Sequence, residues 1–227
     1  VRKRCSMYKE RRRAPAVSTG KSQLAFPDNY IVVDVETTGL YPDRDRLIEI
    51  GAEKVVQGEV VDTFSSLLQP KAHFTGQFVS PFITRLTGIT NAMLQEAPAA
   101  QDVLGQFTQF VGDGLLLGYN VGFDAQFLAA RSQALLGTPI LNDYVDILIY
   151  AQTLHPEEQG HRLADMVRLY GLTNENAHRA LSDVDATRLV YGRLRAEALA
   201  KFGTEEAFFK EVCRAGYHAE EEQLSLW

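Results

Sequence analysis

Cysteine, tryptophan and long apolar runs are all scarce in this sequence. Its 227 residues include two cysteines and one tryptophan. Cys5 and Cys213 are too few and too far apart to suggest a metal cluster or a disulfide framework, which predicts a reducing, cytoplasmic environment. No apolar run approaches the roughly 20 residues that a membrane helix needs, and the basic first residues lack the apolar segment of a signal peptide. We therefore expect a cytoplasmic protein that does not engage a membrane.

Positive charge is scarce in most of the chain. Of the 23 Lys and Arg residues, eight lie in residues 1–21 beside a single acid, Glu10, while the other 28 acids and 15 basic residues give the remainder a balance of −13. Such a body would repel a phosphate backbone unless bound metals and a local basic surface reversed the sign. The basic start is typical of a solvated arm, and a weak hold on nucleic acid is compatible with it. Because the chain begins with Val1, a fragment and a non-standard start codon both stay open.

Apolar periodicity predicts strands that alternate with helices after a flexible leader, residues 1–28. Strands are expected over residues 30–35, 47–56, 60–68, 115–119 and 143–146, with a hairpin turn at 57–59. Helices are expected over residues 80–88, 99–111, 123–136, 163–170, 179–200 and 204–213, with a further one ending at 154. This order indicates an α/β domain in which helices cover a mixed sheet.

Two carboxylates mark the end of the first expected strand. Asp34 and Glu36 lie two residues apart, so their side chains start on the same face of the strand. Oxygen ligands in this arrangement suit Mg²⁺ or Mn²⁺, although solvated acids at a strand end are an equally simple interpretation of this motif alone. The Thr37-Thr38-Gly39-Leu40 segment strengthens the functional interpretation, because its glycine permits a tight turn where the backbone could approach a ligand.

Three further residues are candidates for chemistry. Asp124 follows an apolar strand in the pattern Asn120-x-x-Phe123-Asp124, although an acid at a helix N-terminus is by itself unremarkable. Asp183 would likewise be a surface helix acid if His178 did not precede it by five residues. An imidazole has a pKa suited to a general base when it lies near a metal site.

Together these segments resemble the three exonuclease motifs of the DEDDh family, the group that contains bacterial replicative proofreading subunits. Asp34 and Glu36 match the first motif, Asp124 the second, and His178 with Asp183 the third. The four residues between the last pair match the histidine-type branch, since the tyrosine-type branch would carry tyrosine at position 179. One departure is position 118–120, Gly-Tyr-Asn, where relatives often have histidine before the asparagine.

The resemblance covers residues 29–200 and implies a ribonuclease-H-like fold, a mixed five-stranded sheet flanked by helices. It implies hydrolysis from a 3′ end with release of nucleoside monophosphates, supported by two divalent ions, Mg²⁺ or Mn²⁺. Asp34, Glu36 and Asp183 would hold the ion that activates water, and Asp34 with Asp124 the second ion. His178 would take the proton of the water.

By the same resemblance, a pocket would hold the terminal nucleotide. Its expected residues are Thr37, Thr38, Gly39, Leu40, Asn120 and Phe123. The expected partners are nucleic acid 3′ ends, above all single-stranded DNA, and a DNA polymerase.

The last five residues suggest a second partner. Gln223, Leu224, Ser225, Leu226 and Trp227 follow an acidic stretch and resemble the short peptide with which bacterial polymerases bind the sliding clamp. That peptide usually ends in phenylalanine, and apolar anchors on a polar tail suit insertion into a pocket of a partner. The alternative is that Trp227 folds back onto the domain.

Domain organisation and substrate leave alternatives open. We expect a leader at residues 1–28, an exonuclease domain at 29–200, a C-terminal helix at 201–214 and a tail at 215–227. The favoured function is a 3′–5′ exonuclease acting on DNA in proofreading or repair. An RNA-trimming exonuclease and a non-catalytic clamp- or polymerase-binding subunit are the competing hypotheses.

Overall fold

A five-stranded mixed sheet forms the centre of the computed structural model, which describes residues 18–71, 76–174 and 177–215. The strands are β1 (Asn29–Thr37), β2 (Leu47–Val56), β3 (Glu59–Leu67), β4 (Leu116–Gly118) and β5 (Tyr144–Asp146). Their order is β3–β2–β1–β4–β5, and the first three strands pair antiparallel whereas β1, β4 and β5 run parallel. The expected α/β fold with a mixed sheet is confirmed.

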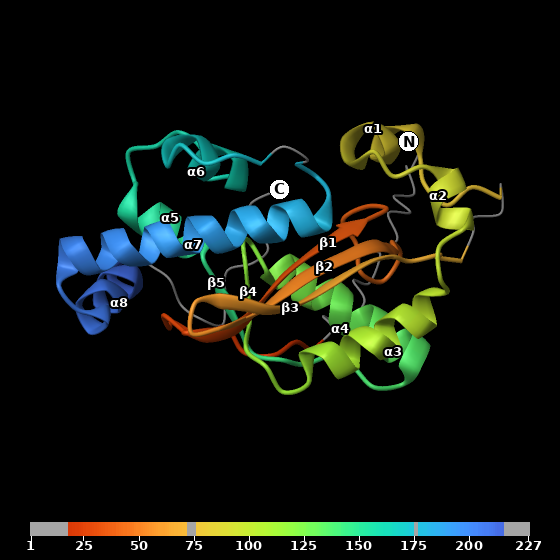
Figure 1. Cartoon of the computed structure of the whole chain (residues 1–227), viewed down its shortest axis with the longest axis horizontal. Coiled ribbons are helices and arrows are strands. Elements are labelled where there is room, and N and C mark those ends of the chain that lie inside the picture. The colour runs from red at the N-terminus through yellow and green to blue at the C-terminus, as the bar shows by residue number, and fades with distance from the viewer. Residues whose placement is uncertain (1–17, 72–75, 175–176, 216–227) are drawn as a thin grey trace, which may run out of the picture.

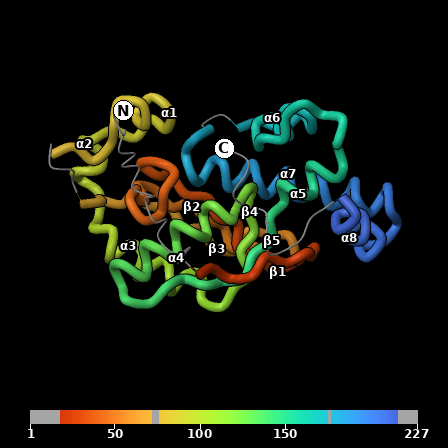
Figure 2. The backbone as a smooth tube through the Cα atoms, turned by 180° about the vertical axis from the view of Figure 1, so that it is seen from behind, coloured from red at the N-terminus to blue at the C-terminus, as the bar shows by residue number. Residues whose placement is uncertain are grey.

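Helices cover both faces of this sheet (Figure 1). They are α1 (Pro81–Thr87), α2 (Asn91–Gln95), α3 (Ala100–Val111), α4 (Gly122–Leu136), α5 (Leu148–Leu154), α6 (Leu163–Leu169), α7 (Ala180–Phe202) and α8 (Glu205–Arg214). The long α7 crosses one face, with α5, α6 and α8 beside it, and α3 and α4 cover the other. The view from behind shows α4 running along the sheet on the side away from α7 (Figure 2).

The alternation of side chains along β1 divides the core between the two faces. Tyr30 and Val32 pack into the cluster that includes α7, whereas Ile31, Val33 and Val35 pack into the cluster that includes α3 and α4. Because successive side chains of a strand point to opposite faces, the even-numbered residues that follow also face α7. The acids at the end of β1 therefore lie under the N-terminal half of that helix.

Local sequence signals account for most element boundaries. Ser80 caps α1 by accepting a hydrogen bond from the Ile83 N–H, and Gly88 ends that helix in a left-handed conformation, φ 74°. The β2–β3 hairpin turns through Gln57 and Gly58, whose φ values of 51° and 85° are those of the two-residue hairpin turn. The turn is thus one residue shorter than expected, and β3 begins earlier.

Two features depart from the expectations. Residues 18–28 are not a free leader: Ser22 bridges to Tyr144 of β5, and Phe26 is buried in the core between Tyr150 and Phe208. A buried aromatic side chain removes a large apolar area from water and so helps to hold this segment, in which the sequence shows no strand-like pattern. The short helix α2, capped by Thr90, was also not foreseen, since five residues are too few for a helical periodicity.

Candidate active site

The candidate site lies where the parallel strands end. The carboxyl ends of β1, β4 and β5 meet at one edge of the sheet. Asp34 and Glu36 lie near the carboxyl end of β1, on the face toward α7. Antiparallel pairing places Gly51 of β2 opposite Asp34 and Glu49 opposite Glu36. This edge is where open α/β sheets commonly bind ligands.

Asp124 reaches the same edge from the opposite layer. It lies in the first turn of α4, is 5% exposed, and its Oδ1 accepts a hydrogen bond of 2.9 Å from the Val35 N–H between the two β1 acids. Burial raises the pKa of Asp124 well above its usual range, although the Val35 hydrogen bond opposes this shift. The acid is therefore bound directly to the strand that carries the other two carboxylates.

The N-terminus of α7 supplies the last two expected residues. His178 has a left-handed backbone, φ 66°, and its N–H donates to Asp183 Oδ2 at 2.9 Å. The other carboxylate oxygen of Asp183 accepts from Asn174 Nδ2 at 2.6 Å, and Ser182 Oγ donates to Asn174 Oδ1 at 2.6 Å. These bonds hold the Asp183 carboxylate toward the loop that contains His178.

Three of these residues could share a metal ion. Glu36, His178 and Asp183 each offer a ligand atom, and these atoms all lie within 4.8 Å of one another. Carboxylate oxygens suit Mg²⁺ and Mn²⁺, and imidazole suits softer first-row ions. The donor set at this edge is therefore compatible with a divalent cation.

The electrostatics of the site also favour a bound cation. Burial, and then the carboxylates of Asp124, Asp183 and Glu36, raise the pKa of Asp34 well above its usual range. Burial, followed by Asp183 and Glu49, raises the pKa of Glu36 to about 8. Buried like charges are costly unless a counter-charge compensates them, and a divalent ion would restore the ionised form of each ligand.

The segment after β1 forms a braced turn beside these acids. Thr37 Oγ1 donates to the Gly39 carbonyl at 2.6 Å, and Thr38 exchanges two hydrogen bonds with Arg46. A side chain at Gly39 would collide with the Asp45 carboxylate, and Leu40 beyond it is exposed. The expected pocket residues 37–40 are thus held on a short closed loop with one apolar side chain open to solvent.

The other two expected pocket residues lie at the start of α4. Asn120 has a left-handed backbone, φ 59°, and its N–H donates to Asp146 Oδ1 at 2.9 Å. The Phe123 ring packs against Phe127, with centroids 4.9 Å apart. Asn120 lies between the end of β4 and the start of α4, and β4 neighbours β1, so the second motif meets the first at the ends of neighbouring strands.

Two buried acids at this edge were missed from the sequence. Glu49 of β2 is 2% exposed and binds Arg179, and Asp146 at the end of β5 is 4% exposed. Burial raises the pKa of Asp146 to about 6, opposed by hydrogen bonds from the backbone of Leu148 and Asn120. An acid inside the apolar run 47–50 was the available signal for Glu49, since buried acids are rarely left unpaired.

A cavity of about 600 Å³ lies elsewhere and contains none of the expected site residues. It is lined by Gln23, by residues 111–115 and 139–143, and by Thr108. The expected clamp-binding residues 223–227 lie outside the described residues. Within the part of the chain that the structure describes, we find no helix with both the length and the apolar character needed to cross a membrane.

The mixed five-stranded sheet, with carboxylates gathered at one edge, defines a ribonuclease-H-like exonuclease domain. The chain belongs to the exonuclease family, because residues 31–191 match the family described as Exonuclease. Curated relatives include DNA polymerase III PolC-type of Latilactobacillus sakei subsp. sakei (strain 23K), which is 36% identical over 188 residues, 83% of this chain and 13% of that protein. The PolC-type polymerase of Bacillus subtilis (strain 168) is 34% identical over 188 residues, 82% of this chain and 13% of that protein. The chain therefore spans only a small part of the length of these polymerases.

Solved structures share the fold. E. coli ExoI in a zinc-bound complex with single-stranded DNA superposes with a TM-score of 0.63 at 21% identity, covering 76% of this chain and 43% of that chain. The nuclease domain of 3′hExo, a DEDDh family member bound to rAMP, gives a TM-score of 0.60 at 22% identity, covering 78% of this chain and 94% of that chain. Both neighbours thus share the fold of this chain over 76% and 78% of its length, and the second of them is a DEDDh family member.

Proposed function

We propose that this protein is a metal-dependent 3′–5′ exonuclease that hydrolyses DNA to nucleoside monophosphates in proofreading or repair. The observation that carries the proposal is the meeting of four carboxylates at one sheet edge. Asp34 feels the charges of Asp124, Asp183 and Glu36, although the four residues come from β1, α4 and α7. Such a cluster is unfavourable without cations and is the usual arrangement for two-metal phosphodiester hydrolysis.

The ligands divide between two ions in this proposal. Asp34, Glu36 and Asp183 would hold one ion, and Asp34 with Asp124 the other. Bound divalent ions would stabilise the negative charge on the attacking and leaving oxygens of the phosphodiester. The protein contributes the rigid placement of the carboxylates, for which the Val35 hydrogen bond to Asp124 and the Asn174 hydrogen bond to Asp183 are evidence.

His178 is the proposed general base. Its ring lies within 4.8 Å of ligand atoms of Glu36 and Asp183, so it borders the space where the attacking water would be activated. An imidazole at this place can act as the general base that takes the proton of that water. The hydrogen bond from its own N–H to Asp183 keeps the backbone of His178 next to the ligand.

The terminal nucleotide would lie on the braced turn after β1. The proposed contacts are Thr37, Thr38, Gly39 and Leu40, with support from Asn120 and Phe123. Leu40 is 49% exposed and is thus available to contact an unpaired base. Single-stranded 3′ ends are the proposed substrate.

The choice of DNA over RNA rests on the relatives. The PolC-type relatives are DNA polymerases, and ExoI was solved with single-stranded DNA. The RNA alternative has support of its own, since one structural neighbour is a 3′-exonuclease that recognises a histone mRNA stem-loop. Matched DNA and RNA oligonucleotides of one sequence, digested side by side, discriminate between the two, and equal or faster RNA cleavage contradicts the DNA assignment.

The experiment that tests the reaction uses 5′-labelled single-stranded DNA with Mg²⁺ or Mn²⁺. The wild-type protein should give a ladder that shortens from the 3′ end, and Asp34→Ala should give none. Asp185→Ala is the matched control, because the Asp185 side chain on α7 is half-exposed and pairs with Arg188. Loss of activity in Asp183→Ala together with retention in Asp185→Ala would tie the reaction to the site.

Partner binding is a separate part of the proposal. Residues 223–227 are the proposed clamp-binding peptide, and a DNA polymerase is the proposed second partner. Deleting Gln223–Trp227 should abolish binding to a bacterial sliding clamp and leave hydrolysis of free oligonucleotides intact. Unfolding upon that deletion would favour the fold-back of Trp227, and clamp binding by a wild-type protein without any nuclease activity would favour a non-catalytic subunit.

A further inference from the structure

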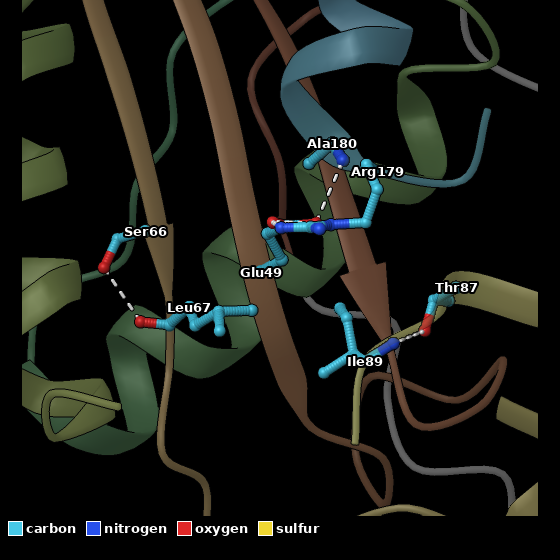
Figure 3. A network of polar contacts seen from close by, with 7 residues as sticks. All are labelled: Glu49, Ser66, Leu67, Thr87, Ile89, Arg179 and Ala180. Atoms are coloured by element: carbon cyan, nitrogen blue, oxygen red, sulfur yellow. Dashed lines mark hydrogen bonds and ion pairs between the residues drawn. The ribbon is translucent and has the colours of Figure 1, made fainter. Parts of the chain in front are cut away.

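A buried acid of β2 is bonded to the first turn of the helix that carries the third motif. Glu49 is 2% exposed and lies opposite Glu36 in the β1–β2 pairing. Its side chain points to Arg179 and Ala180, which begin α7 (Figure 3). Glu49 is therefore a neighbour of the proposed ligand Glu36 and is bonded to the start of α7.

The contacts of Glu49 leave neither carboxylate oxygen free. Arg179 Nε donates to both oxygens at 3.1 Å, and Nη2 donates to Oε1 at 2.7 Å. The Ala180 N–H donates to Oε2 at 3.0 Å. Bidentate ion pairs of this kind combine strength with a defined geometry, so Glu49 is occupied as a partner of Arg179.

These contacts also cap a helix that has no local cap. The side chain of the N-cap residue Arg179 makes no capping hydrogen bond within α7, so the acid from β2 satisfies the free Ala180 N–H in its place. The neighbouring Gly51 permits close contact, because a Cβ there would lie 2.5 Å from the Ala180 carbonyl carbon. The start of α7 is thus pressed directly against the backbone of β2.

Arg179 stands between the two functional residues of the third motif. It follows His178 directly, and its carbonyl accepts the Asp183 N–H at 3.0 Å. A shift of Arg179 would therefore move both His178 and Asp183 relative to the acids of β1. Displacements of about 1 Å can cost catalysis a hundredfold.

We infer that Glu49 and Arg179 form a positioning pair that sets the third motif in register with Asp34 and Glu36. This inference rests on the proposed function, because it assigns the pair to the same site. Neither residue is a catalytic residue in it: both oxygens of Glu49 are occupied, and Arg179 acts through the backbone on either side of it, while its charge also lowers the pKa of Glu36.

A second ion pair between the same two elements provides a matched control. Glu53 of β2 binds Arg188 of α7, with Nε 2.8 Å from Oε2, and Glu53 is also buried. This pair lies four residues further along β2 and nine further along α7, away from the motif residues. If the Glu49–Arg179 pair only held the fold together, its loss and the loss of the Glu53–Arg188 pair would have the same consequences.

The experiment compares Glu49→Gln and Arg179→Met with Glu53→Gln and Arg188→Met. Melting temperature, Mn²⁺ affinity by calorimetry, and kcat and KM on single-stranded DNA are measured for each. We expect the first two variants to lose about 10- to 100-fold in kcat or Mn²⁺ affinity, as residues that orient metal ligands commonly do, with little change in KM. The control variants should lose melting temperature to a similar degree and keep kcat and Mn²⁺ affinity close to wild type. The double variant Glu49→Gln/Arg179→Met should lose no more than the worse single variant, since the two residues act as a unit.

The outcomes separate this inference from the proposed function. Equal effects of the two pairs on kcat and on Mn²⁺ affinity, at matched melting temperature, would overturn the positioning role while leaving the nuclease assignment intact. If the wild type cleaved no nucleic acid, amide hydrogen exchange of residues 180–183 without metal would still decide: faster exchange in Glu49→Gln than in Glu53→Gln supports the pair, and equal exchange overturns it.

Discussion

Backbone conformations at single residues already set this site apart. Three non-glycine residues in the described part of the chain have a left-handed backbone, and two of them, Asn120 and His178, belong to the candidate site. Residues other than glycine, asparagine and aspartate adopt this backbone conformation at a cost in free energy, so at His178 the surrounding contacts must impose it. At His178 those contacts include the hydrogen bond to Asp183.

One prediction distinguishes two roles of His178, that of a general base and that of a metal ligand. His178→Ala should lower kcat by about a hundredfold or more, because general bases contribute on that order, while Mn²⁺ affinity stays near wild type. His178→Asn is the control, since asparagine tolerates the left-handed backbone; it should be equally slow but more stable than the alanine variant by about 1 kcal/mol. A fall in Mn²⁺ affinity as large as that of Asp183→Ala would instead make His178 a ligand.

A second prediction concerns Asp146. Burial raises its pKa to about 6, so the folded state keeps its proton to a higher pH than the unfolded state does. Stability should therefore fall as the pH rises from about 4 to 6, and the loss should be complete above that range. The melting temperature of the wild type relative to Asp146→Asn, followed across this window with Mg²⁺ present, measures the effect. The asparagine keeps an oxygen for the Asn120 and Leu148 N–H groups and has no charge to titrate, so a constant difference between the two proteins would contradict the prediction.

At the scale of elements, the packing of α7 on β2 decides where the third motif lies. Glu49, Gly51 and Glu53 alternate along the strand, and all three face the helix. Two of them are ion-paired, and the third is a glycine against backbone. Together with the apolar side chains of α7 that pack in the core, these three contacts hold the start of the helix against β2.

The prediction at this scale is that Gly51→Ala displaces the start of α7. Its Cβ would meet the Ala180 backbone at 2.5 Å, and backbone cannot move aside as a flexible side chain can. We expect a loss of stability of about 1–3 kcal/mol, as overpacking commonly causes, together with a loss of kcat. Gly192→Ala, within α7 itself, is the control. Nothing lies within 4 Å of a Cβ at that position, so this variant should gain about 0.5–1 kcal/mol of stability and keep full activity. Chemical denaturation of both variants beside a kcat measurement checks this, and a fully active Gly51→Ala protein would contradict it.

At the scale of the whole molecule, the concentration of acids makes stability depend on metal. The formal net charge is −6, and the acids at the sheet edge raise one another's pKa values. Folding brings these carboxylates together, and their mutual repulsion should lower the stability of the folded protein until a cation compensates their charge.

We predict that Mg²⁺ or Mn²⁺ raises the melting temperature and that EDTA reverses the change. At 100 times the dissociation constant the shift should be about 5–10 °C for a chain of this size. Asp34→Asn should melt higher than wild type in EDTA, because it removes one repelling charge, and should lose most of the metal-induced shift. Asp185 is a half-exposed acid of α7, so Asp185→Asn should respond to metal as the wild type does. Equal metal responses of the two variants would mean that the ion does not bind at the sheet edge.

Much of the architecture could be predicted because its signals are local. The β-branched run of β1, the Ser80-Pro81 start of α1 and the Gly137 end of α4 each act on neighbouring residues, and the structure agrees with them within a few positions. The family motifs were found in the same way, since each motif is a short stretch of chain. The site roles that they imply stay predictions.

The remaining features depend on partners distant in sequence. That Phe26 is buried, that Glu49 binds Arg179, and that Asp124 accepts the Val35 N–H could not be predicted, because each contact joins segments separated by 80 residues or more. Glu49 and Asp146 seemed ordinary acids until the sheet placed them in the interior.

The sequence by itself determined the order of the elements and the identity of the candidate acids and histidine, because periodicity, caps and motif spacing depend on neighbouring residues. The tertiary structure alone decided that these groups face one another and which contacts hold them there. The physical reason is that strand pairing brings Gly51 and Glu49 of β2 opposite Asp34 and Glu36, and helix packing sets α7 over them. Burial at that meeting point then turns ordinary carboxylates into groups with raised pKa values and a need for a cation.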